Sequence, residues 1–297
     1  MKALITDIKR NSLDDGPGVR SVTFFKGCPL RCVWCQNPET QSVYQEIHFD
    51  YEVCVQCHEC KNICPVEAIE FSNFYPINKK ICNYCGKCVR SCEMEALKFV
   101  GKTYNLQELL DLILLDKIFY QNSGGGITLS GGEPTMQVRF LHELLKKVKE
   151  NSIHVCLETC GFFKTKEFFE KILPFVDVIY FDLKIFDEME HKKYCGVSNK
   201  LILQNFERLL AEESITVLPR IPLIPSITTN KENLLNWVNY LEKFNIKKIG
   251  LLPYNPLWLS KMKHLGHDFV YYHKKWLSDK EKNLIKNIFS QFEFRNF

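Results

Sequence analysis

The strongest constraint in this chain is the distribution of its cysteines. Fourteen of the 297 residues are Cys, and eleven of these lie between Cys28 and Cys92. The segment Met1–Asp7 has an early acidic residue and no apolar signal core, so we expect a cytoplasmic protein. A reducing cytosol disfavours disulfides, and clustered thiols there more often bind metal. The pattern therefore predicts metal-binding modules and argues against a disulfide scaffold.

Composition excludes several other classes of protein. Hydrophobic residues make up 45% and charged residues 25%, which are globular values. The 39 basic and 35 acidic residues give a net charge of +4, too small to indicate a nucleic acid or a membrane surface as partner. The longest apolar run, Leu109–Leu115, is interrupted by Asp111, so no transmembrane helix is expected.

Two kinds of sequence alternate along the chain. The segment of residues 49–100 is short, cysteine-rich and poor in long periodic patterns, which is typical of a small module held together by metal. We therefore predict a domain formed by residues 1–48 and 101–297, with residues 49–100 inserted as a second domain. A chain of this length is consistent with about two domains.

The flanking sequence predicts an α/β fold, because strand and helix patterns alternate in it. About six strand–helix units imply βαβ connections and a parallel sheet, which right-handed crossovers would curl into a barrel or partial barrel. Ligands of such folds bind at the carboxyl ends of the strands. The expected strands are Val19–Phe25, Ile127–Leu129, Ile153–Glu158, Val176–Leu183, Ile215–Ile221 and Lys248–Leu252. The expected helices are Leu106–Ile118, Gln137–Glu150, Lys164–Ile172, Asn199–Leu210, Lys231–Phe244 and Ser278–Phe292.

The first cysteine group is a C-x3-C-x2-C triplet, Cys28, Cys32 and Cys35, in a loop after the first of these strands. Three closely spaced thiolates suit an iron–sulfur cluster. A [4Fe–4S] cluster with three such ligands leaves one iron open to an outside ligand, as in catalytic metal sites generally. The alternative is a zinc site completed by a distant ligand such as His48.

With Trp34 before its third cysteine, the triplet resembles the signature of the radical S-adenosylmethionine (SAM) enzymes. The neighbouring segments Asp15–Arg20 and Gln36–Glu39 are similar to those of the glycyl radical enzyme activating enzymes, a branch that includes the pyruvate formate-lyase activating enzyme. The resemblance implies that the open iron chelates the amino and carboxylate groups of SAM. An electron from the reduced cluster then cleaves the sulfonium to give a 5′-deoxyadenosyl radical.

The second cysteine group consists of two runs with matching spacing. This is the bacterial two-cluster ferredoxin pattern, in which the fourth Cys of each run binds the other cluster. It predicts one [4Fe–4S] cluster on Cys54, Cys57, Cys60 and Cys92, and another on Cys82, Cys85, Cys88 and Cys64. A zinc ribbon is the alternative, although zinc does not require this paired spacing. With every iron saturated, electron transfer is the expected role; docking of a partner protein is the other possibility.

Polar residues and glycines at the expected strand ends resemble the SAM-binding positions of the family. Ser130–Pro134 is similar to the motif that contacts the SAM amino group, although a structural turn would also explain it. Lys184 suits the SAM carboxylate, while acidic side chains suit its ribose or a bound monovalent cation; an internal ion pair is the alternative. The implied cofactor-binding residues are Trp34, Gln36, Gly131, Gly132, Glu133, Glu158, Asp182, Leu183, Lys184, Arg220 and Asn255.

Two of these positions depart from the family pattern. Asn255 replaces a His, so it can form hydrogen bonds but cannot titrate near neutral pH, and Gln36 likewise stands where the pyruvate formate-lyase activator has a His. The remaining cysteines, Cys156, Cys160 and Cys195, are expected to be small buried apolar residues.

The resemblance as a whole implies an activating enzyme with a partial (β/α)6 TIM-like barrel and a ferredoxin-like insert. Its catalytic residues would be Lys184 and the three thiols of the triplet. It would use three [4Fe–4S] clusters and SAM, and would abstract a hydrogen atom from the C-terminal glycyl loop of a partner glycyl radical enzyme, with Asp15–Gly18 contacting that loop. The electron donor would be a flavodoxin or a ferredoxin. Two alternatives remain: a radical SAM enzyme acting on a small molecule, and a ferredoxin-type electron carrier.

Overall fold

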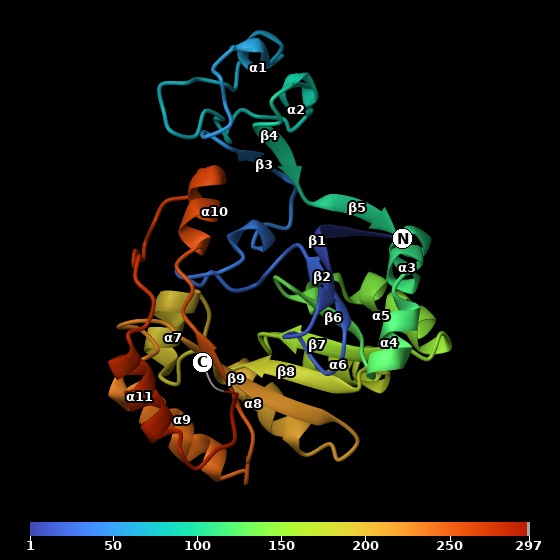
Figure 1. Ribbon diagram of the computed structural model, residues 1–297, viewed down its shortest axis with the longest axis vertical. Coiled ribbons are helices and arrows are strands. Elements are labelled where there is room, and N and C mark those ends of the chain that lie inside the picture. The colour runs from blue at the N-terminus through green and yellow to red at the C-terminus, as the bar shows by residue number, and fades with distance from the viewer. Residues whose placement is uncertain (296–297) are drawn as a thin grey trace.

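The computed structural model describes residues 1–295 and is organised around one eight-stranded mixed sheet (Figure 1). The strand order is β10-β9-β8-β7-β6-β2-β1-β5. All neighbours from β2 to β10 are parallel, whereas β1 is antiparallel to both β2 and β5. The bounds are β1 Lys2–Ser12, β2 Arg20–Phe25, β5 Lys102–Asn105, β6 Gly126–Gly131, β7 His154–Thr159, β8 Val178–Asp182, β9 Thr216–Leu223 and β10 Gly250–Pro253.

Helices connect the parallel strands and cover the sheet (Figure 1). Helix α5 shows why: its buried residues Phe140, Leu141, Leu144, Leu145 and Val148 recur at helical spacing and form one apolar face. The helices are α3 Leu106–Leu114, α4 Lys117–Ser123, α5 Val138–Glu150, α6 Thr165–Lys171, α7 Glu188–Cys195, α8 Lys200–Leu210, α9 Lys231–Glu242, α10 Trp258–His264 and α11 Asp279–Ile288. None of the described helices is long and apolar enough to cross a membrane.

A smaller lobe projects from the sheet at the top of Figure 1. We call residues 46–100 the cysteine-rich lobe: strands β3 Glu46–Phe49 and β4 Leu97–Val100 pair antiparallel, and the chain between them forms the short helices α1 Glu59–Asn62 and α2 Lys87–Ser91. Its buried hydrophobic residues, Ile47, Phe49, Ile69, Ile77, Ala96 and Leu97 with Cys60 and Cys88, form a cluster separate from the main core. The lobe therefore has its own small core.

The parallel part of the predicted sheet is confirmed, because six expected strands correspond to β2 and β6–β10. The prediction of one helix over Leu106–Ile118 is wrong. The helix is interrupted at Asp116, whose buried carboxylate accepts hydrogen bonds from Ser21 Oγ (2.6 Å) and Arg10 Nε (2.8 Å). Strands β1 and β5, which extend the sheet beyond β2, and the helices α7 and α10 were not predicted from the sequence.

Candidate active site

A cavity of about 480 Å³ lies at the carboxyl ends of the parallel strands. This volume is within the range of ordinary small-molecule sites. Its lining includes all three cysteines of the triplet, together with Trp34, Gln36, Gly131, Gly132, Glu158, Asp182, Lys184, Arg220 and Asn255. The structure thus brings most of the predicted site residues together from six different strand ends. Glu133 and Leu183 are the two predicted contacts that do not line the cavity.

The loop that follows β2 holds the cysteine triplet through backbone hydrogen bonds on two sides. Gly27 N donates to Thr40 O (2.7 Å), and Arg31 N donates to Cys195 O (2.8 Å) at the end of α7. A second bond, from Val33 N to the neighbouring Tyr194 O, is 3.0 Å long. These bonds fix the backbone of the loop between the segment at Thr40 and helix α7, and the thiols face the cavity.

The three thiols of the triplet are chemically suited to an iron–sulfur cluster, because they form an all-sulfur donor set and none is in a disulfide. Burial raises the pKa of Cys35 to about 12, so at neutral pH this thiol stays protonated without a bound cation. Among residues 1–295, no three His, Cys, Asp or Glu side chains converge closely enough to hold a single metal ion. In a cluster each thiolate binds its own iron, so such convergence is not required.

The glycine pair after β6 allows two loops to pack in direct contact. A Cβ on Gly132 would lie 2.2 Å from Gly27 O and 2.7 Å from Thr40 O, closer than any side chain tolerates. Gly132 N donates to Phe25 O (2.9 Å), and Glu133 N donates to Gly27 O (2.8 Å). The pair therefore has a packing role in addition to its place in the cavity wall.

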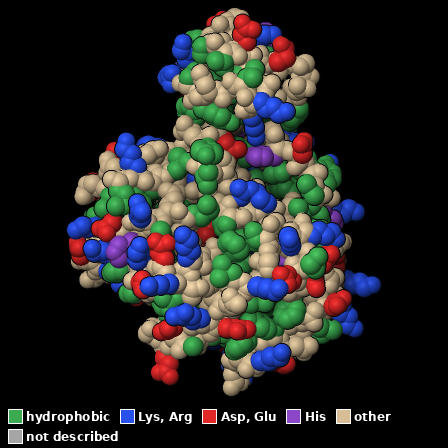
Figure 2. Space-filling view, turned by 180° about the vertical axis from the view of Figure 1, so that it is seen from behind, with side chains coloured by type: hydrophobic (Ala, Val, Ile, Leu, Met, Phe, Trp, Pro, Cys, Tyr) green, Lys and Arg blue, Asp and Glu red, His purple; other side chains and the backbone are tan. Residues whose placement is uncertain are grey.

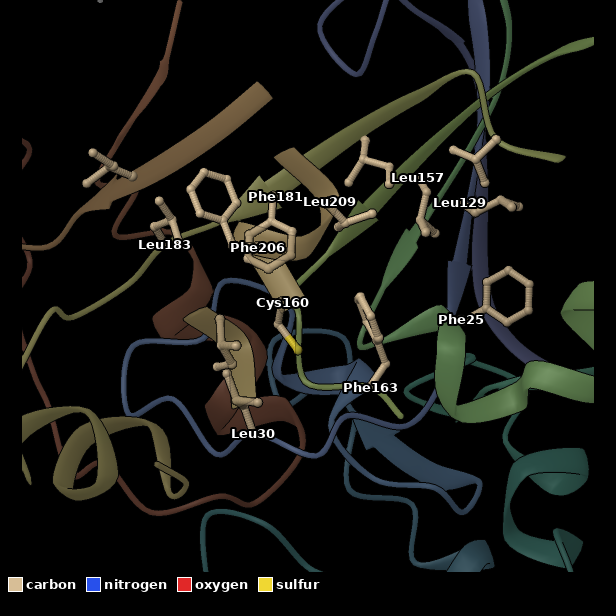
Figure 3. Close-up of a cluster of buried hydrophobic side chains, with 14 of the residues drawn as sticks. Phe25, Leu30, Leu129, Leu157, Cys160, Phe163, Phe181, Leu183, Phe206 and Leu209 are labelled. Atoms are coloured by element: carbon tan, nitrogen blue, oxygen red, sulfur yellow. The ribbon is translucent and has the colours of Figure 1, made fainter. Parts of the chain in front are cut away.

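Glu133 is fully buried, and both oxygens of its carboxylate accept hydrogen bonds from other residues. Oε2 accepts hydrogen bonds from Thr159 Oγ1 and Cys160 N, both 2.8 Å, and Oε1 accepts from Thr135 Oγ1 at 2.8 Å. These contacts join the ends of β6 and β7. Leu183 is also fully buried, within the cluster of hydrophobic side chains shown in Figure 3. Their assignment as cofactor contacts stays a prediction.

Four charged residues form a network across the strand ends. Arg220 on β9 lies between Glu158 (Nη1–Oε1, 2.5 Å) and Asp182 (Nε–Oδ1, 2.9 Å), and Lys184 Nζ is 3.0 Å from Asp182 Oδ2. Ser130 Oγ donates to the other oxygen of Glu158 (2.5 Å). Two carboxylates and two cations balance in charge, so the internal ion pairs considered from the sequence do form. All four nevertheless line the cavity, where their remaining hydrogen-bonding capacity is available to a ligand.

The charges of this network determine its protonation. Burial raises the pKa of Asp182. The positive charges of Arg220 and Lys184 lower it by a larger amount, so the pKa of Asp182 is below its ordinary value. Burial lowers the pKa of Lys184, yet the charge of Asp182 outweighs it and the net pKa is raised. Asp182 is therefore anionic and Lys184 cationic at neutral pH.

The structure adds residues to the cavity wall that the sequence analysis did not assign to the site. Trp276 lines the cavity although its side chain is 56% exposed. It lies between α10 and α11 in a stretch without regular secondary structure, where no motif or periodicity marked it. Cys160 also lines the cavity, and Figure 3 shows it between Leu30 and Phe163. Cys156, Cys160 and Cys195 are all buried, as expected from the sequence.

Two further cavities divide the cysteines of the lobe. One, of about 430 Å³, is lined by Cys54, Cys57, Cys60 and Cys92. The other is lined by Cys64, Cys82, Cys85 and Cys88. The fourth cysteine of each run therefore lies with the first three of the other run.

Comparison with known proteins identifies two sequence families in the chain. A model of the Radical SAM superfamily matches residues 72–238, more than half of the chain, and a model of the 4Fe-4S binding domain matches residues 47–70. Neither match includes the triplet at residues 28–35. The second match covers the first of the two cysteine runs in the lobe.

Curated relatives align over nearly the whole chain. The trans-4-hydroxy-L-proline dehydratase activating enzyme of Clostridioides difficile is 38% identical over 303 residues, covering 100% of this chain and 98% of the relative. The choline trimethylamine-lyase activating enzyme of Oleidesulfovibrio alaskensis is 38% identical and covers 99% and 96%. The benzylsuccinate synthase activating enzyme of Thauera aromatica is 39% identical and covers 89% and 82%. With relatives of this identity along its length, the chain belongs to the radical SAM superfamily and, within it, to the activating enzymes of glycyl radical enzymes.

Proposed function

We propose that this protein generates a radical on a glycine of a partner glycyl radical enzyme. The observation that supports this most directly is the cysteine triplet facing the same cavity as the strand-end charges. When bound, a reduced [4Fe–4S] cluster supplies the electron that splits SAM into methionine and a 5′-deoxyadenosyl radical. That radical takes one hydrogen atom from the glycine, which gives 5′-deoxyadenosine and a protein-borne glycyl radical.

The chain's own residues bind and orient the reactants. Cys28, Cys32 and Cys35 would hold the cluster and leave one iron without a protein ligand. Lys184 and Arg220 present the cationic groups that a SAM carboxylate requires. The carboxylates of the network would accept hydrogen bonds from the ribose or hold a monovalent cation. The amides of Gln36 and Asn255, the ring of Trp34 and the backbone of the glycine pair would complete the site.

Water must be excluded from a site that produces so reactive a radical. We infer that the C-terminal glycyl loop of the partner enters the cavity and closes it. Asp15, from the segment proposed to contact this loop, lines the cavity, and its backbone oxygen accepts a hydrogen bond from Thr128 Oγ1 (2.6 Å). The segment is therefore attached to the wall that the loop would meet.

The finer architecture is also part of the proposal. The six parallel strands would form a partial (β/α)6 barrel from residues 1–48 and 101–297, and residues 49–100 would be a ferredoxin-like insert with two [4Fe–4S] clusters. The separate core of the lobe and the division of its cysteines between two cavities support this assignment. A flavodoxin or ferredoxin would supply the electrons.

The partner enzyme belongs to the class on which the relatives act, whose names include a dehydratase, a lyase and a decarboxylase. To test the function, the protein is reconstituted anaerobically to about twelve irons per chain, the content of three four-iron clusters. Reduced protein and SAM are then mixed with candidate partners. We expect 5′-deoxyadenosine together with the doublet paramagnetic resonance signal of a glycyl radical.

Cysteine variants distinguish the alternatives. Cys28→Ser should lose about a third of the iron and all 5′-deoxyadenosine formation, since one of three clusters is lost. Cys156→Ala, at a buried cysteine that lines none of the described cavities, should keep both. Deoxyadenosine without a glycyl radical on any partner would favour a small-molecule substrate. Absence of 5′-deoxyadenosine formation in wild-type protein with its full iron content would favour an electron carrier.

A further inference from the structure

The two segments of the lobe that contain the cysteine runs have opposite net charge. Residues 50–70 contain five acidic residues and one basic residue, whereas residues 71–92 contain four basic residues and no acidic one. The net charge of the whole chain is only +4, so this separation within a short stretch is a local feature. Each run supplies three of the four cysteines in one cavity, so the two cavities lie among residues of different charge.

Among residues 1–295, three of the four basic side chains have no ion-pair partner. Lys79 lies 3.8 Å from Glu46 at the base of the lobe. Lys80, Lys87 and Arg90 are exposed, and within residues 1–295 no carboxylate is within ion-pair distance of them. Figure 2 shows Lys and Arg side chains along the left edge of the upper lobe and acidic side chains at its top. These three cations are therefore available to a partner.

Two of these cations, Lys87 and Arg90, lie beside the exposed cysteine of the second run. Lys87 lines the cavity of Cys64, Cys82, Cys85 and Cys88. Arg90 Nη2 donates to Cys85 O (3.0 Å), and Cys85 itself is exposed. We call Lys87 and Arg90 with Cys85 the basic face, and we add to it the exposed Lys80, which lies two residues before Cys82 in the chain. An electron arriving here would have only a short distance to a cluster held by these thiols.

The cavity of the other four cysteines has the opposite surroundings. Glu59 and Glu93 line it, and among the described residues neither carboxylate has an ion-pair partner. A negatively charged protein would be repelled from this side of the lobe and attracted to the basic face. Charge arrangement of this kind governs the encounter rate and the choice of partner more than the affinity.

We propose that an acidic one-electron carrier protein docks on the basic face and reduces the cluster on Cys64, Cys82, Cys85 and Cys88. The inference rests on the proposed two-cluster assignment of the lobe. In the step, one electron leaves the reduced carrier and enters the oxidised cluster, which is reduced by one unit. No bond forms or breaks and no proton is transferred. Interfaces of electron-transfer pairs are small, so a few charges suffice to steer them.

The test uses the reconstituted full chain and a reduced acidic flavodoxin as the probe. Lys80→Glu/Lys87→Glu should lower the second-order rate constant of cluster reduction by roughly ten- to a hundredfold at low ionic strength. The affinity for the oxidised probe, measured by calorimetry, should also decrease. The wild-type rate constant should fall steeply as salt rises towards 0.3 M, because the Debye length there is below about 8 Å.

Two control variants separate docking from net charge. Lys231→Glu/Lys243→Glu changes the total charge equally, at exposed lysines at the two ends of α9 far along the chain from the lobe, and should leave the rate constant unchanged. Glu59→Lys/Glu93→Lys should not lower it. Iron and sulfide are measured in every variant. If Lys80→Glu/Lys87→Glu loses iron, Lys80→Gln/Lys87→Gln replaces it, and we expect a smaller decrease in the rate constant.

Unchanged rate and affinity in the lobe variants with full iron content would overturn the proposal, as would a loss caused by the Glu59/Glu93 variant. Such a result leaves the proposed function intact if dithionite-reduced wild-type protein still produces the glycyl radical. Absence of that radical with normal carrier docking would instead count against the function alone.

Discussion

Arg220 forms ion pairs with two carboxylates, whose negative charges would otherwise have no positive charge between them. Its side chain is 12% exposed, and its partners Glu158 and Asp182 are 12% and 22% exposed. Burying charges is costly, and the cost is recovered only where the geometry satisfies each of them. The guanidinium does so with separate nitrogens for the two carboxylates. A lysine has one nitrogen and cannot reproduce this arrangement.

Replacing Arg220 with Met should therefore destabilise the protein by roughly 3–5 kcal/mol, since it leaves buried charges unpaired. The affinity for SAM should fall as well. Arg220→Lys should show an intermediate effect, and Arg139→Met, at an exposed Arg on α5, should change little. Anaerobic urea unfolding and SAM binding measure the two quantities. A stable Arg220→Met protein with unchanged SAM affinity would contradict this account.

The sequence indicated which residues gather at the strand ends, but not which of them face inward. Glu158 and Glu133 both follow or end predicted strands, and both were assigned to SAM. Glu133 is occupied by Thr159 and Cys160, which are 26 and 27 residues away in the chain. Contacts of this range depend on how β6 and β7 are placed, so local sequence cannot reveal them.

At the level of elements, the turn after β6 determines how the loop with the cysteine triplet lies. The Gly132 backbone is pressed against the oxygens of Gly27 and Thr40, and Cys28 is the next residue after Gly27. Backbone atoms cannot rotate away as a side chain would. Any side chain at this position must displace the loop that holds the thiols.

Gly132→Ala should accordingly cost about 1–3 kcal/mol of stability and reduce occupancy of the catalytic cluster, so that up to a third of the iron is lost. Gly124→Ala is the matched control. Its φ of +66° makes it strained by about 1 kcal/mol, but no atom lies within 4 Å of the added Cβ. The control should keep its iron, which metal analysis of the two reconstituted variants will show. Full iron content in both variants would refute the packing argument.

Strong periodicity located the parallel strands and their helices, whereas weak patterns were missed. In β1 only Ala3, Ile5 and Ser12 are buried, so most of the strand gives no alternating signal. Strand β5 has no fully buried residue. Both owe their position to pairing with neighbours rather than to their own composition.

At the level of the whole molecule, Glu46 joins the cysteine-rich lobe to the catalytic part. Its buried carboxylate is 2.7 Å from Lys26 Nζ, 3.8 Å from Lys79 and 3.3 Å from His267 Nε2. Burial raises the pKa of Glu46. The contacts with His267 and Lys26 lower that pKa by a larger amount, so Glu46 is anionic at neutral pH. Lys26 also donates to Glu39 O (2.6 Å), next to the catalytic loop.

Glu46→Gln should loosen this junction, because fully buried Lys26 loses the one carboxylate that it contacts among residues 1–295. We expect faster hydrogen exchange in β3 and β4 and after α10, with a loss of roughly 3 kcal/mol. Glu95→Gln breaks an exposed pair with Lys98 in the same lobe and should cost less than about 1 kcal/mol. Hydrogen-exchange mass spectrometry compares the variants. Equal protection in both would mean that the junction does not depend on this charge.

The chain enters and leaves the lobe through paired residues, since Glu46 and Val100 are opposite each other in the β3–β4 ladder. Opposite residues of an antiparallel pair are about 5 Å apart. Excising everything beyond this pair would leave two ends that a short turn could reconnect, with the catalytic loop unmoved. Evolution could therefore gain, discard or exchange the cysteine-rich lobe without rebuilding the sheet beneath it.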